Sequence, residues 1–173
     1  MRALFIIAQR GYQDYEYSAT KKVLEAAGIE VPTASKEGGA CIGSSGSMVK
    51  DTLALADVKL EPYSAFVLIG GPGAVIYQHD AQVHELLKEA KHQHKVLAAI
   101  CIAPTTLAYA GILSGRKATM WNLDGQQESV LAQQGAKYTG EEVTTDGKII
   151  TANGPAAAEA FGKMIIEVLK KIR

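Results

Sequence analysis

The stretch formed by residues 96–100 and the cysteine after it most constrains the fold of this chain. Five apolar residues in a row, Val-Leu-Ala-Ala-Ile, are typical of a parallel strand that is covered on both faces. Pro104 then opens a second apolar segment, and proline suits the start of a helix because its missing N–H would lack a partner there. The pattern predicts that Cys101 lies on a tight turn between a buried strand and a helix, with its side chain above the sheet edge.

Two interpretations of Cys101 follow from this position. Backbone N–H groups and the positive end of a helix favour a thiolate, so the turn predicts a thiol that loses its proton readily. Alternatively, Cys101 belongs to the core, because cysteine is among the most buried residue types. The rest of the chain has to decide between them.

Composition excludes several classes of protein. A length of 173 residues favours a single domain that spans residues 1–173. The 18 basic side chains are balanced by 18 acidic ones, so the chain lacks the positive electrostatic potential that a nucleic-acid partner would need. Two distant cysteines form neither a disulfide framework nor a zinc site, so we expect a reducing, cytoplasmic location with no metal and no cofactor. The apolar run 3–8 is too short for a signal peptide or a membrane span and is predicted as the first strand.

Strand and helix patterns alternate along the chain. The periodicity predicts strands at 2–8, 29–34, 65–69, 96–100 and 117–120, with an irregular hairpin around Cys41 and a hairpin of 142–145 and 148–151 about Asp146-Gly147. Helices are predicted at 15–27 (after a turn at 11–14, with Asp14 as the cap), 80–94, 105–110, 126–134 and 156–171. This order indicates an α/β fold in which a mainly parallel sheet carries helices on both faces.

Three chemically useful features follow the predicted strands. Sites in open α/β sheets gather at the carboxyl ends of strands, where Glu16, the Gly70-Gly71 turn and Cys101 fall. An acid, a source of backbone N–H groups and a nucleophile are the parts of a covalent site with an oxyanion pocket. The alternative for Glu16 is a solvated acid in the first turn of a helix, favoured by the helix dipole.

Motifs that carry a family resemblance occur throughout the chain. They are Arg2–Ala8, Glu16, Ala27-Gly28-Ile29, Gly70-Gly71-Pro72-Gly73, Ala99-Ile100-Cys101-Ile102-Ala103-Pro104 and the run from Asp146 to Pro155. Through these motifs the chain resembles the DJ-1/PfpI superfamily, which includes the PfpI endopeptidase and the parkinsonism-associated deglycase.

The resemblance implies a flavodoxin-like three-layer sandwich, of the class I glutamine amidotransferase type, with Cys101 as a reactive cysteine. Glu16 would lie beside the sulfur and donate a hydrogen bond to the thiolate. Gly70 and Gly71 would form the turn of the oxyanion pocket, in which the Gly71 and Ile102 amides are the donors. A carboxyl group near a thiolate in a partly dry pocket is expected to have a raised pKa, in agreement with this role.

The chain lacks the histidines that such proteins usually carry near the cysteine. In PfpI-type members a histidine directly follows the cysteine, where this chain has Ile102, and the deglycase-type histidine aligns with Trp121. Trp121 is expected to wall the pocket and to favour small apolar or carbonyl substrates. His79 is the one histidine that this reasoning does not exclude. The others are expected to be solvated around a surface helix: His84, His92 and His94.

Two classes of function remain. The first is a cysteine-dependent stress-response protein with weak glyoxalase- or deglycase-like activity on small reactive carbonyls, in which Glu16 donates or shuttles the proton. The second is a non-enzymatic redox-sensing chaperone with an oxidisable Cys101, and an intracellular cysteine peptidase ranks below both. The resemblance also implies a homodimer or higher homo-oligomer, and nothing in the sequence indicates a membrane or nucleic-acid partner.

Overall fold

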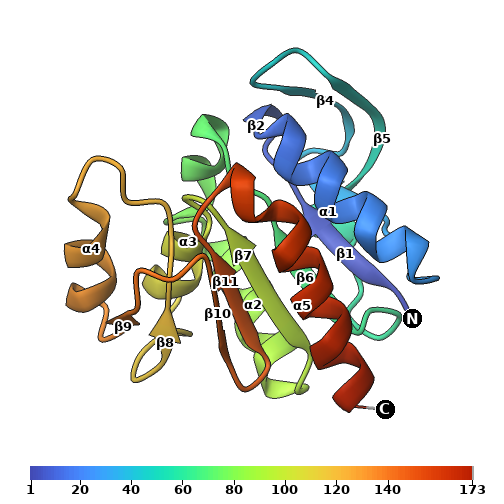
Figure 1. The fold of residues 1–173 in the computed structure, drawn as a ribbon. Helices are drawn as coiled ribbons and strands as arrows, with labels where there is room; N and C mark the ends of the chain where they lie inside the picture. Colours follow the sequence, from blue (N-terminus) through green and yellow to red (C-terminus); the bar gives the residue numbers. More distant parts are fainter. Residues whose placement is uncertain (173) are drawn as a thin grey trace.

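A mainly parallel sheet of nine strands runs through the protein (Figure 1), whose computed structural model describes residues 1–172. The strands follow the order β10-β11-β7-β6-β1-β3-β5-β4-β2, and only the β10–β11 and β4–β5 pairs among them are antiparallel. Their bounds are β1 Ala3–Ile6, β2 Arg10–Tyr12, β3 Thr33–Ser35, β4 Gly39–Gly43, β5 Met48–Ala54, β6 Ala65–Leu68, β7 Val96–Ile100, β10 Val143–Asp146 and β11 Ile149–Ala152. Two short strands, β8 (Lys117–Ala118) and β9 (Lys137–Tyr138), form a separate parallel pair.

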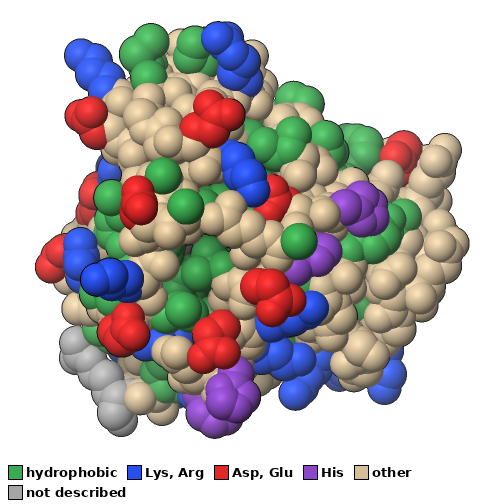
Figure 2. Space-filling model, turned by 180° about the vertical axis from the view of Figure 1, so that it is seen from behind, with side chains coloured by type: hydrophobic (Ala, Val, Ile, Leu, Met, Phe, Trp, Pro, Cys, Tyr) green, Lys and Arg blue, Asp and Glu red, His purple; other side chains and the backbone are tan. Residues whose placement is uncertain are grey.

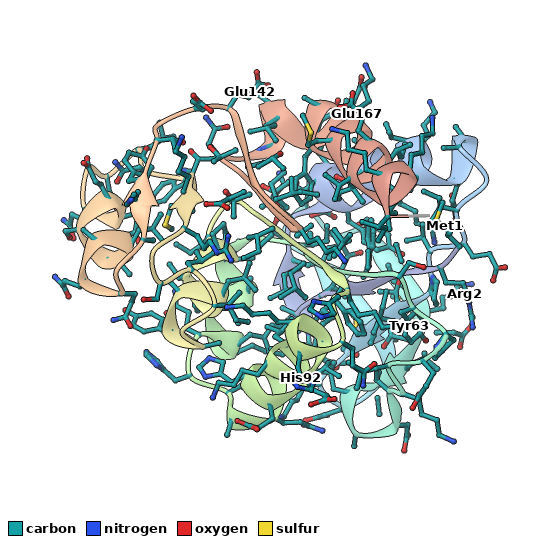
Figure 3. The ribbon with its side chains drawn as sticks, turned by 90° about the horizontal axis from the view of Figure 1, so that it is seen from below. Met1, Arg2, Tyr63, His92, Glu142 and Glu167 are labelled. Atoms are coloured by element: carbon teal, nitrogen blue, oxygen red, sulfur yellow. The ribbon has the colours of Figure 1, made fainter. Side chains whose placement is uncertain are left out.

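Helices cover both faces of the sheet, as the sequence predicts for a flavodoxin-like three-layer sandwich. They are α1 Asp14–Ala26, α2 Ala81–His92, α3 Pro104–Tyr109, α4 Gln127–Gln133 and α5 Ala158–Lys171, with 3-10 turns at 55–57, 72–77 and 155–157. The pair α1 and α5 packs on one face, and α2 and α3 pack on the other. The view along the layers places Glu167 of α5 and His92 of α2 on opposite sides of the sheet (Figure 3).

Alternate side chains of the central strands enter two separate cores. In β1, Ala3 and Phe5 pack toward α1 and α5, whereas Leu4 and Ile6 pack toward α2 and α3, and all four are buried. A strand that is covered on both faces needs apolar side chains at every position. The unbroken apolar runs that identified these strands are therefore a consequence of the three-layer arrangement.

The parallel direction of β6, β7 and β11 sets the place of the candidate site. These strands run the same way, so the segments that follow Leu68, Ile100 and Ala152 meet at one edge of the sheet. Helix α1 begins at the same edge, after β1 and β2.

Several predicted boundaries were wrong, for local physical reasons. The strand predicted at 29–34 begins only at Thr33, because the stretch before it contains Pro32, which has no N–H and pairs through its carbonyl to Phe5 N at 2.9 Å. The strand predicted at 117–120 stops at Ala118, since the N–H of Thr119 donates to the side chain of Thr151 at 2.9 Å.

The segment before α1 also differs from the prediction. Residues 10–12, partly assigned to a turn, form the edge strand β2 against β4. Asp14 does not cap α1, because its carboxylate accepts from the backbone N–H groups of Ser45 and Ser47 at 2.8 and 2.9 Å. Gln13 is the cap instead, and its Oε1 accepts from Glu16 N at 2.7 Å.

The two hairpins lie where they were predicted. Strands β4 and β5 pair around the Gly-Ser-rich turn, and β10 pairs with β11. The turn between β10 and β11 falls one residue later than expected. Asp146 still belongs to the strand, where it pairs with Ile149, and the turn begins at Gly147, which has a φ of 63°. Within residues 1–172, none of the helices has the length and apolar character needed to cross a bilayer.

Truncation of a central core residue tests this packing. Phe5 in β1 is fully buried, so Phe5→Ala should lower the free energy of unfolding by about 3–5 kcal/mol. Urea unfolding followed by circular dichroism measures the change. Met48→Ala, at a residue that is 57% exposed, is the matched control and should change stability by less than about 0.5 kcal/mol. Equal losses for the two variants would contradict the assigned core.

Candidate active site

Cys101 occupies a strained turn directly after β7. Its φ of 64° lies in the left-handed region, which non-glycine residues adopt rarely and at some energetic cost. Hydrogen bonds hold the turn on both sides: Cys101 N donates to Ala152 O, and Cys101 O accepts from Trp121 N, each at 2.9 Å. The strand-to-helix turn predicted for this residue is therefore present, and it holds the side chain at the end of the sheet.

Glu16 lies buried beside the sulfur. Its side chain is fully inaccessible, its Oε2 accepts from Gly70 N at 3.0 Å, and its carboxyl group is within hydrogen-bonding reach of the Cys101 thiol. The other oxygen, Oε1, has no hydrogen-bond partner among the described residues. The alternative of a solvated helix-start acid is therefore wrong for this residue.

Burial dominates the proton affinity of this carboxyl group. Loss of water raises the pKa of Glu16 to about 7, against the opposing effect of hydrogen bonds from Cys101 and Gly70. The pKa shift has the predicted direction, and burial, one of the two predicted causes, is the largest.

The expectation of an acidic thiol was wrong. Burial raises the pKa of Cys101 to about 12, and the negative charge of Glu16 adds to the rise. The amides of Gly71 and Ile102 hydrogen-bond to the sulfur and lower the pKa, but they do not outweigh the desolvation. Helix α3 has only six residues, so it provides a weak dipole at this turn.

The Glu16 carboxyl group and the Cys101 thiol form a coupled pair that holds at least one proton throughout the neutral range. The pair releases its first proton near pH 7 and its second only in strongly alkaline solution. A carboxylate that titrates near neutrality is suited both to accept the thiol proton and to return it. The site therefore holds a thiol and a carboxyl group that can exchange a proton in contact.

Glycine is required at both positions of the turn after β6. A Cβ on Gly70 would stand 2.5 Å from Cys101 Cβ and 2.8 Å from Glu16 Oε2. A Cβ on Gly71, which has a φ of 106°, would stand 2.5 Å from Gln13 N. Close approach of the turn to Cys101, Glu16 and Gln13 therefore depends on the absence of side chains.

A mainly apolar cavity of about 420 Å³ opens over the sulfur. Its lining combines five segments of the chain: Gln13, Gly71, Pro72, Val75, Cys101, Ile102, Trp121 and Pro155. Together with buried Glu16 and Gly70, the structure brings all six predicted site residues to one place. Four lining residues were not among the site residues predicted from the sequence: Gln13, Pro72, Val75 and Pro155. Pro72 and Pro155 belong to motifs that carry the resemblance, whereas Gln13 and Val75 had no local signal, since glutamine is not a favoured helix cap.

The histidines lie away from this cavity. His79 is exposed and packs against Tyr109, with ring centroids 4.3 Å apart. His84 is half-buried, contrary to the expected solvation, because its Nε2 is hydrogen-bonded with Gln78 O at 2.8 Å. Figure 2 shows histidine side chains on the face opposite α1 and α5, and none of them lines the cavity. In the described part of the chain, no group of three or more His, Cys, Asp or Glu side chains is arranged to hold a metal ion.

Comparison with known proteins gives a consistent result over the whole chain. The model of the DJ-1/PfpI family matches residues 1–168. An uncharacterised protein of Methanocaldococcus jannaschii is 34% identical over 98% of this chain and 83% of its own length. A protein named glutathione-independent glyoxalase DJR-1.2, from Caenorhabditis elegans, is 27% identical over 97% of this chain and 88% of its own.

A named deglycase and a solved structure extend the comparison. The deglycase, from Pyrococcus horikoshii, is 29% identical over 98% of this chain and all of its own length. The crystal structure of a ThiJ/PfpI domain protein from Brachyspira murdochii superposes with a TM-score of 0.94 at 28% identity, covering 99% of this chain and 98% of the other.

The accessibility of the two thiols predicts selective labelling. Cys41 is fully buried, whereas Cys101 is partly exposed at the cavity. Limiting iodoacetamide at pH 7.5 should label Cys101 at least about tenfold faster than Cys41, although slowly, because the thiol pKa is high. Peptide mass spectrometry measures both rates, and faster labelling of Cys41 would contradict the assignment.

Burial of Glu16 predicts a pH-dependent loss of stability. The folded protein binds this proton more tightly than the unfolded chain, so the stabilisation is complete below the usual pKa near 4.5 and is lost as pH rises through about 7. Between pH 4.5 and pH 8 this group should remove about 3 kcal/mol from the free energy of unfolding. Glu16→Gln, which keeps the size and an acceptor for Gly70 N, should lack this loss. Chemical denaturation at several pH values tests it, and parallel curves for the two proteins would refute it.

Proposed function

This chain belongs to the DJ-1/PfpI family, and on that premise we propose that it converts small reactive carbonyl compounds through Cys101, in the manner of a glyoxalase or deglycase. The observation that carries the proposal is the contact between a thiol and a buried carboxyl group of pKa about 7, below a small apolar cavity. The names of two relatives, a glyoxalase and a deglycase, support the same class of reaction. Two free cysteines fit a reducing cytoplasm, which we propose as the location.

The proposed first step is addition of sulfur to a carbonyl carbon. As the S–C bond forms, the thiol proton passes to the Glu16 carboxylate, and the carbonyl electrons move onto oxygen. The amides of Gly71 and Ile102, which contact the sulfur in the free protein, are placed to stabilise that oxyanion. Glu16 then returns the proton, so one group serves in turn as base and acid.

Proton transfer on the adduct would complete a glyoxalase reaction. In an adduct of a 2-oxoaldehyde, Glu16 removes the proton from the carbon bonded to sulfur and returns it to the neighbouring carbon, which leaves a thioester. Water cleaves the thioester to a 2-hydroxy acid and restores the thiol. The steps consume water alone and need no cofactor.

Two properties of the site, the raised pKa of the thiol and the side chains that line the cavity, separate this proposal from the alternatives. Oxidation by peroxide requires the thiolate, and both the burial of Cys101 and the Glu16 charge raise the pKa of the thiol and disfavour that form. A peptidase needs a proton donor for the leaving amine, usually histidine, and no histidine lines the cavity. We therefore favour carbonyl chemistry over redox sensing and over peptide hydrolysis.

Turnover of methylglyoxal tests the proposal. We expect weak conversion to lactate that is lost in Cys101→Ala and retained in the matched variant Cys41→Ala. Trp121→His, which places the base of the aligned family members in the cavity wall, should raise kcat/KM roughly tenfold or more. Conversion that persists in Cys101→Ala, or rapid peptide hydrolysis by the unmodified protein, would refute it.

A further inference from the structure

We propose that Gln13 determines the substrate class by donating a hydrogen bond from Nε2 to the second oxygen of an uncharged 2-oxoaldehyde bound at Cys101. The inference rests on the proposed function and assigns it a specific substrate feature. Gln13 lines the cavity together with Cys101 and was not among the residues singled out from the sequence.

One side-chain hydrogen bond orients the Gln13 amide, and two backbone contacts hold its segment in place. Its backbone N donates to Gly70 O at 2.9 Å, and its Oε1 accepts from Glu16 N at 2.7 Å. Because a backbone N–H needs an acceptor, the oxygen of the amide must face Glu16 and the NH₂ group must face away. The close packing of Gly71 on Gln13 N holds the same segment against the turn that contacts the sulfur.

The Nε2 group is free to bind a ligand. Among the described residues it has no hydrogen-bond partner, and the side chain is half-buried in the cavity wall. The remaining lining side chains are glycine, proline, valine and isoleucine, apart from Cys101 and the indole of Trp121. The Gln13 amide is fixed through its oxygen, so its NH₂ group is a single positioned donor in an otherwise mainly apolar wall. Binding pockets use such isolated polar groups to orient a ligand.

The position of this donor favours a vicinal dicarbonyl. Addition of the thiol to an aldehyde carbon forms an S–C bond and places the former carbonyl oxygen at the Gly71 and Ile102 amides, with the thiol proton transferred through Glu16 to that oxygen. The product is a hemithioacetal, and no oxidant or second reactant is required. A 2-oxoaldehyde carries its second oxygen on the adjacent carbon, where Gln13 can donate to it. A simple aldehyde has no oxygen there.

Charge distinguishes a 2-oxoaldehyde from a 2-oxo acid. No lysine, arginine or histidine lines the cavity, and the Glu16 carboxylate lies directly below it. A carboxylate in place of the second carbonyl would lose water without gaining a cation, which disfavours its binding. The cavity should therefore select uncharged dicarbonyls.

Competition for the thiol provides the experiment. Methylglyoxal and propanal have three carbons each and differ in the second oxygen. In the Cys41→Ala background at pH 7.5, each compound is tested for its ability to protect Cys101 from iodoacetamide, which gives a dissociation constant for the adduct. Each constant is divided by the constant for the same compound with a free small thiol, and the ratio of the two quotients is the corrected preference. The corrected preference for methylglyoxal over propanal should fall about three- to tenfold in Gln13→Glu, the value of one hydrogen bond.

Two variants separate hydrogen bonding from folding. Gln13→Glu keeps the shape and the acceptor for Glu16 N but loses the donor, and Gln13→Ser keeps a helix cap with no charge and no reach into the cavity. Both should lose the preference while retaining the thermal midpoint within a few degrees. Because the preference is a ratio, a change in the intrinsic thiol reactivity cancels.

The outcomes distinguish this inference from the proposed function. The same corrected preference in the unmodified protein and both variants, or glyoxylate that protects as well as methylglyoxal after the same correction, would overturn the role of Gln13. Protection of Cys101 by methylglyoxal without any turnover would refute the proposed function and leave the selection by Gln13 intact.

Discussion

The burial of Glu16 against the Gly70 amide is the interaction on which the site depends. A carboxyl group with no access to water is placed in the first turn of a helix, a position at which acids are usually solvated. This placement needs the close approach of the Gly70-Gly71 turn and a Cys101 backbone in the left-handed region. The three-layer fold supplies both by bringing the ends of β6 and β7 to one edge. The energetic cost of backbone strain and of desolvation at one edge of the sheet is thus offset by the burial of apolar side chains in the two cores.

The balance of forces on the thiol explains why the site combines a nucleophile with a base. Amides of Gly71 and Ile102 favour the thiolate, but removal of water and the Glu16 charge favour the neutral thiol more strongly. A raised pKa lowers the fraction of thiolate at neutral pH, which slows oxidation by peroxide. In the proposed reaction the thiol becomes a nucleophile when a carbonyl carbon accepts its electrons and Glu16 accepts its proton. Under that proposal, reactivity is restricted to electrophiles that fit the cavity above the pair.

The sequence predicted those features that local patterns encode. Apolar runs predicted the central strands, and the glycine turn, Glu16 and Cys101 were placed at strand ends because parallel strands share a direction. The predicted direction of the Cys101 pKa shift was wrong, because desolvation depends on how tightly α1 and the Gly70 turn close over Cys101. No local sequence pattern records this closure. Gln13 replaced Asp14 as the cap because Ser45 and Ser47, about thirty positions away, bind the Asp14 carboxylate. The expected association into homo-oligomers stays a prediction.

The absence of histidine from the cavity lining limits the chemistry that one carboxyl group can perform. Peptide hydrolysis needs a proton delivered to a leaving nitrogen and a water deprotonated later, commonly by one mobile imidazole with two nitrogens. Glu16 is held by the Gly70 amide and lies within hydrogen-bonding reach of the Cys101 sulfur. A fixed acid can move a proton between adjacent atoms of one small substrate, as addition to a carbonyl and isomerisation of the adduct require. Ile102 and Trp121 line the cavity where the resemblance leads one to expect imidazole, and the proposed function therefore assigns the site compact carbonyl compounds, whose whole reaction takes place within reach of Glu16.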